Sequence, residues 1–191
     1  MDFKFSEDQS AIRELAHQIF TDRATDEFLL EFSRTDNTYD DGLWQTLAEQ
    51  GLLGIAVPEA AGGSGLGLVE LCMVLEEQGR RVAPVPLYSS LVLGGLPIAE
   101  FGTDEQQQSW LGLLVRGEAK FSAAIAELGM NAAVAAEVKA EKKGDHWILN
   151  GSKAVVPDGA VADFVLVPAV GDDGASHVFV VPAVAEGVEL T

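Results

Sequence analysis

The sequence contains a single cysteine, Cys72, among its 191 residues. One cysteine cannot form a disulfide within the chain and cannot supply a cluster of thiolate ligands to a metal ion. The three histidines lie far apart, and no group of His, Asp or Glu residues has the spacing of metal ligands. The sequence therefore predicts neither a disulfide scaffold nor a metal site, and the scarcity of cysteine fits a protein of the cytoplasm.

Long hydrophobic runs and basic residues are also scarce. No segment approaches the roughly 20 uninterrupted apolar residues of a membrane span, and the stretch 1–9 carries acidic residues where an export signal has an apolar region. The sequence has 12 Lys and Arg residues against 30 Asp and Glu, which gives a formal net charge of -18. Such a surface repels a phosphate backbone, so we expect no membrane span and no nucleic-acid partner.

Helical patterns fill the first half of the sequence. Ser6 and Gln9 have the spacing of a capping box, and the apolar residues behind them recur three and four positions apart. We expect the later helices to end at glycines, the fourth of them at Gly94-Gly95. The predicted helices begin near these residues: Ser6, Asp41, Leu68, Tyr88 and Thr103.

Strand patterns fill the second half. Short runs rich in β-branched and aromatic residues follow from 146 onward, with turn residues between them, as at 171–174. They predict antiparallel strands joined by tight turns. Helices followed by strands are typical of an α+β chain. We therefore predict an all-helical domain over 1–118 and an antiparallel β-domain over 119–191, and this second domain looks incomplete because the sequence stops within strand-like residues.

A glycine-rich segment lies at 58–67 and reads Pro-Glu-Ala-Ala-Gly-Gly-Ser-Gly-Leu-Gly. Glycine-rich segments between helices are mostly turns, and this one lacks the spacing of a nucleotide-binding loop, so we assign it no chemistry. It resembles the Pro-Glu-x-x-Gly-Gly-x-Gly-Leu-Gly loop of acyl-CoA dehydrogenases. The segments 101–107 and 139–153 are similar to other parts of that family, so the resemblance covers nearly the whole chain.

The resemblance implies a fold and a reaction. The fold is an N-terminal helical domain packed on a central β-domain, without the C-terminal helical bundle that follows in the family. The reaction is the oxidation of an acyl-CoA thioester to the trans-2-enoyl-CoA by FAD. Because the family's catalytic base belongs to the C-terminal bundle, we predict no catalytic residue in this sequence and no activity for the isolated chain.

Two stretches correspond to the flavin contacts of the family, and both depart from its pattern. The family has Thr where this sequence has Ala126, an aromatic residue at Val155 and Thr at Pro157. Two hydroxyl groups and an aromatic ring are therefore missing, and Pro157 also lacks a backbone N–H. We expect Ile125, Ala126, Val155 and Pro157 to lie at the flavin, and FAD to bind only in a complete assembly.

The acyl chain in the family runs beside the fourth helix. Val85, Ser89 and Leu93 match that position and recur at every fourth residue, on one face of a helix. The resemblance implies that these three residues and Asn131 bind the acyl-CoA substrate. The spacing alone favours ordinary core packing over a tunnel wall, so both interpretations stay open.

These observations support three functions. The first is a part or subunit of an FAD-dependent acyl-CoA dehydrogenase, with a homologous dehydrogenase subunit or the missing C-terminal domain as its partner. The second is a non-catalytic, flavin-degenerate subunit of a heteromeric dehydrogenase. The segment 80–86 resembles actinobacterial members of that kind, some of which act on bulky steroid-type CoA thioesters. The third is an acyl-CoA-binding module without redox chemistry.

Overall fold

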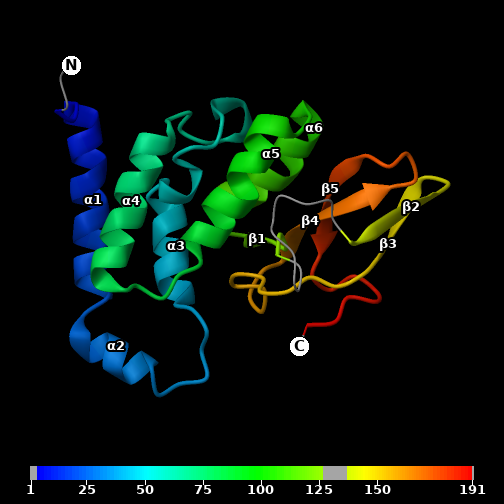
Figure 1. Ribbon diagram of the computed structural model, residues 1–191. Coiled ribbons are helices and arrows are strands. Elements are labelled where there is room, and N and C mark those ends of the chain that lie inside the picture. The colour runs from blue at the N-terminus through cyan, green and yellow to red at the C-terminus, as the bar shows by residue number, and fades with distance from the viewer. Residues whose placement is uncertain (1–3, 127–136, 191) are drawn as a thin grey trace.

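The computed structural model describes residues 4–126 and 137–190. A group of helices comes first in the chain, and a five-stranded sheet with its connecting loops follows and lies beside the helices (Figure 1). The predicted α+β fold class is confirmed.

Short polar side chains start the first helices. Ser6 and Gln9 form the predicted capping box, and Thr25 and Asp40 each accept a hydrogen bond from a backbone N–H of the helix that follows. The helix behind Thr25 was not predicted, and it is only two turns long. The first helices and helical turns are α1 (Glu7–Arg23), α2 (Asp26–Phe32), α3 (Asp41–Glu49), η1 (Leu52–Gly54), η2 (Glu59–Ala61) and α4 (Leu68–Arg81).

The next helix does not end at the glycine pair, so that prediction is wrong. A wide π-helical stretch, η3 (Tyr88–Gly95), runs directly into α5 (Leu96–Phe101). A Cβ atom on Gly94 would lie 2.2 Å from the Cβ of Phe121, so glycine here permits close packing against the sheet instead of ending a helix. The remaining helices are α6 (Asp104–Gln106), η4 (Gln107–Leu111) and α7 (Gly112–Val115).

The sheet is mixed, which corrects the expectation of a purely antiparallel domain. The two hairpins that the turn residues predicted are present, β2 with β3 and β4 with β5. However, β4 runs parallel to both β1 and β2, because a long connection carries the chain back before β4 begins. The strands are β1 (Phe121–Ala123), β2 (Lys139–Lys143), β3 (His146–Asn150), β4 (Phe164–Gly171) and β5 (Ser176–Pro182).

One hydrophobic core joins the helices to the sheet. The buried cluster includes Trp44 of α3, Leu114 of α7 and Phe121 of β1, and the ring of Phe121 stacks on Phe164 of β4 with centroids 5.3 Å apart. The indole N–H of Trp44 donates to the carbonyl of Gly117 at 3.0 Å. The helices therefore set the position of the first strands and of the loops attached to them.

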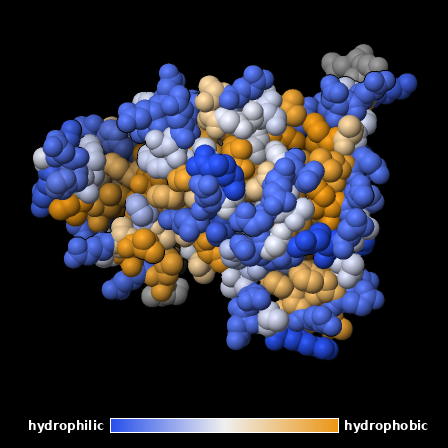
Figure 2. Space-filling view, turned by 180° about the vertical axis from the view of Figure 1, so that it is seen from behind, coloured by the Kyte–Doolittle hydropathy of each residue, from blue (hydrophilic) through white to orange (hydrophobic). Residues whose placement is uncertain are grey.

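The surface of the molecule is largely hydrophilic on the face seen from behind (Figure 2). Figure 2 shows hydrophilic side chains over most of the face in view, with hydrophobic patches between them. No helix within the described parts of the chain is both long and apolar enough to cross a membrane.

Candidate functional site

The loop 151–160, which follows β3, connects both stretches that the sequence assigned to the flavin. The backbone N–H of Ala154 donates to the carbonyl of Ala126 at 2.8 Å. The hydroxyl of Ser122 donates to the carbonyl of Pro157, which fixes the other end of the loop on β1. Residues far apart in the sequence thus form one surface.

That surface is apolar and open. Val155 is 83% exposed and Ile125 is 46% exposed. Val155 also has a φ of +52°, a conformation that a β-branched residue rarely adopts. Ile, Ala, Val and Pro have no side-chain hydrogen-bond donor. The four predicted flavin residues therefore present an apolar face without polar side-chain groups.

A groove of about 570 Å³ lies next to this loop. Its volume falls in the range of about 300–1,000 Å³ that is usual for small-molecule sites. Apolar and aromatic side chains form most of its wall. Residues that line it include Tyr39, Leu75, Val82, Val85, Tyr88 and Asp158.

The predicted substrate residues occupy different environments. Val85 lines the groove, in the irregular segment before η3. Ser89 is fully buried, and its hydroxyl donates to Oδ2 of Asp158 at 2.6 Å. Leu93 packs against the hydrophobic core, and Asn131 lies outside the described residues. Sequence analysis missed Asp158, although it is the acidic residue of the otherwise apolar stretch 155–159.

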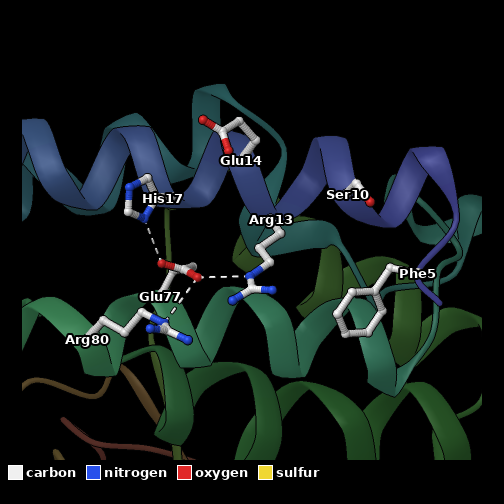
Figure 3. A pocket seen from close by; sticks show the side chains of 7 residues that line it. All are labelled: Phe5, Ser10, Arg13, Glu14, His17, Glu77 and Arg80. Carbon is white, nitrogen blue, oxygen red and sulfur yellow. Dashed lines mark hydrogen bonds and ion pairs between the residues drawn. The ribbon is translucent and has the colours of Figure 1, made fainter. Parts of the chain in front are cut away.

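A polar site, separate from the groove, lies between α1 and α4 (Figure 3). The Glu77 side chain is 3% exposed and accepts from Nε of Arg13 at 3.1 Å. Nδ1 of His17 lies 2.9 Å from the same carboxylate, and Nε of Arg80 lies 3.3 Å from it. Burial raises the pKa of Glu77, but the hydrogen bonds from His17 and Arg13 and the charge of Arg80 outweigh it, so that the pKa is lowered overall.

The sequence analysis assigned no role to His17 and did not single out Glu77. A usable signal was present, because polar residues recur at every fourth position of α1, at Gln9, Arg13 and His17. Gln9 donates to Glu70 at 2.8 Å, one seven-residue step before Glu77 on α4. The two helices therefore run in the same direction with a polar seam between them, which holds the helices together.

The described part of the chain contains no group of three or more His, Cys, Asp or Glu side chains that could hold a metal ion.

The helices match one protein family, described as acyl-CoA dehydrogenase, N-terminal domain, over residues 6–118. The chain belongs to the acyl-CoA dehydrogenase family. The family that the sequence resemblance predicted is therefore confirmed.

Relatives of this chain include FadE27 of Mycobacterium tuberculosis, 35% identical over 192 residues, with 100% of this chain and 50% of the relative covered. The solved Tcur3481-Tcur3483 steroid ACAD is 47% identical with a TM-score of 0.86, over 95% of this chain and 49% of that one. The ChsE4-ChsE5 complex from Mycobacterium tuberculosis is 35% identical with a TM-score of 0.90, over 100% and 51%. The chain spans about half the length of the relatives that it matches.

The family's glycine loop has a packing role in this acyl-CoA dehydrogenase chain. The N–H groups of Ser64 and Gly65 donate to the carbonyls of Gly54 and Val57, both at 2.9 Å. A Cβ atom on Gly63 would lie 2.1 Å from the carbonyl oxygen of Val57. The loop is folded onto the backbone before it, and its glycines permit that close approach.

Proposed function

We propose that the chain forms the N-terminal half of an FAD-dependent acyl-CoA dehydrogenase, which oxidises the Cα–Cβ bond of a bulky, steroid-type acyl-CoA. The groove beside loop 151–160 carries this proposal, because Val85 lines it together with Asp158, which follows Pro157 in that loop. The 47% identity to a steroid ACAD supports the substrate class.

FAD fits the described residues only in part. Val155 and Ile125 offer exposed apolar surface against which a flat ring can pack. The polar edge of a flavin needs hydrogen-bond donors, and the side chains at the four predicted positions supply none. We therefore assign the polar contacts of FAD, which supplies the electron acceptor when bound, to a partner subunit or to a further domain.

The lack of side-chain hydrogen-bond donors at the predicted flavin positions also favours a second candidate function. In a heteromeric dehydrogenase, this chain would be the subunit that lines the acyl groove while a homologous subunit provides the flavin contacts and the catalytic base. The likeness to the ChsE4-ChsE5 complex supports this arrangement. In both proposals the substrate is an acyl-CoA and the functional unit is larger than the 191 residues of this chain.

The isolated chain is expected to purify without colour and to form no micromolar complex with FAD. Each missing hydrogen bond costs about 0.5–1.5 kcal/mol and the missing ring a comparable amount, so these losses alone weaken FAD binding roughly a hundredfold. Isothermal titration checks the affinity. Co-expression with a homologous dehydrogenase subunit should restore both FAD and oxidation of a steroid-type acyl-CoA with an artificial electron acceptor. Turnover by the isolated chain would contradict this expectation.

Val155 offers a test of the apolar flavin surface. We expect Val155→Asp to weaken FAD binding by the reconstituted complex about tenfold, because the variant places a charge against the ring. Asp tolerates the positive φ at this position better than Val does, so folding should be retained. Val184→Asp, at a residue that is 95% exposed, is the matched control. Equal FAD affinity of the two variants would remove Val155 from the flavin surface.

A further inference from the structure

Asp158 brings a charge to the acyl groove. Among the described residues that line this groove, it is the only one with an ionisable acidic or basic group other than the tyrosine hydroxyls. Val85, Pro86 and Tyr88 line the same groove. Asp158 is exposed, so a molecule that lies in the groove can reach its carboxylate.

The carboxylate is held in one orientation. Oδ2 accepts from the buried hydroxyl of Ser89 at 2.6 Å, which links η3 to the loop. The backbone of Asp158 has a φ of +50°, which Asp and Asn tolerate better than most residues. Since Ser89 occupies Oδ2, the second oxygen of the carboxylate remains to accept a hydrogen bond from a ligand.

We propose that Asp158 selects the acyl group by its polarity, with Ser89 as its positioning residue. The inference rests on the proposed function, since it assigns the groove to the acyl group. Asp158 accepts a hydrogen bond from an acyl group that carries a hydroxyl, and it repels an acyl group that carries a second carboxylate. The substrate class is therefore hydroxyl-bearing acyl-CoA thioesters, and dicarboxylic acyl-CoA thioesters are excluded.

The test uses the complex reconstituted with a homologous dehydrogenase subunit and three probes. The probes are acyl-CoAs of matched chain length that end in a methyl, a hydroxyl or a carboxylate group, each made as a series of lengths. We expect the unmodified complex to prefer the hydroxyl probe to the carboxylate probe in kcat/KM at the length that reaches Asp158. Asp158→Asn keeps the size and the contact with Ser89 but removes the charge, and should raise kcat/KM for the carboxylate probe about tenfold.

Asp158→Ala should lower the ratio of kcat/KM for the hydroxyl probe to kcat/KM for the methyl probe about tenfold. Ser89→Ala should reduce the same preference by a smaller factor, because the carboxylate remains but is no longer held. Glu105→Gln, an exposed residue of α6 that does not line the groove, is the control. FAD content and melting temperature establish that each variant is folded.

The outcomes separate the two proposals. Turnover of all three probes with ratios that Asp158→Asn and Asp158→Ala leave unchanged overturns the role of Asp158 alone. No turnover and no binding of any probe by the folded complex overturns the proposed function, and this inference with it. Changed kcat/KM ratios in both Asp158 variants, together with unchanged ratios in Glu105→Gln, support the selection by Asp158.

Discussion

Gly63→Ala is expected to lower the free energy of unfolding by about 3 kcal/mol, at the upper end of the usual cost of an added methyl group. The new Cβ would lie 2.1 Å from the carbonyl oxygen of Val57 and 2.5 Å from its Cβ. Backbone atoms cannot move aside as a flexible side chain can. The hydrogen bond from the N–H of Gly65 to the same carbonyl holds it in place.

Thermal or urea unfolding followed by circular dichroism measures this effect, and the melting temperature should fall by roughly 10 °C. Gly79→Ala in α4 is the matched control, because no atom lies within 4 Å of the added Cβ. That variant should gain about 0.5–1 kcal/mol, since alanine replaces glycine inside a helix. Equal stabilities of the two variants would show that the glycine loop is not folded against Val57.

Glu77→Ala is expected to lower the free energy of unfolding by about 2 kcal/mol. The buried carboxylate is the shared partner of Arg13, His17 and Arg80, so its removal takes one acceptor from each of them, while Arg13 and Arg80 keep Glu76 as an ion-pair partner. Removing one partner of a fully buried ion pair would lower the free energy of unfolding further. The cost is smaller here because water reaches the side chains of Arg13, His17 and Arg80. Glu76→Ala, which removes a half-exposed carboxylate next in sequence, should change stability by less than about 0.5 kcal/mol.

The Glu77 contribution should also depend on pH in a defined direction. The folded pKa of Glu77 is lowered from the ordinary value of 4.5. The stabilisation is therefore complete above pH 4.5 and is lost as the pH falls through the lower folded pKa. Urea unfolding between neutral and acid pH should show Glu77→Gln less stable than the unmodified chain at pH 7, with the difference shrinking below pH 4.5. A difference that grows on acidification would contradict the lowered pKa.

The elements that sequence analysis predicted correctly depend on neighbours in the chain. The caps at Ser6 and Thr103 need only the next three residues, and the turn at 171–174 needs only its own residues to join β4 to β5. The glycine pair at the end of η3 was misinterpreted because the role of Gly94 depends on Phe121, which lies in the sheet.

For the candidate site, the sequence proposed residues but not their arrangement. The family pattern selected Ala126, Val155 and Pro157 from the sequence, and it marked their missing donors. It did not show that the N–H of Ala154 joins the two stretches, because hydrogen bonds between distant segments have no local signal. Asp158 remained unnoticed for the same reason, since its partner Ser89 belongs to a different element.

The sequence by itself determined the family, the succession of a helical half and a strand-rich half, and the scarcity of polar groups at the expected flavin surface. These properties are set by residue types and short spacings, which are readable without coordinates. Only the tertiary structure decided that the sheet is mixed, that Glu77 is buried between α1 and α4, and that Asp158 lines the groove beside loop 151–160. Each of these depends on which distant segments pack together, and packing is decided by the core as a whole.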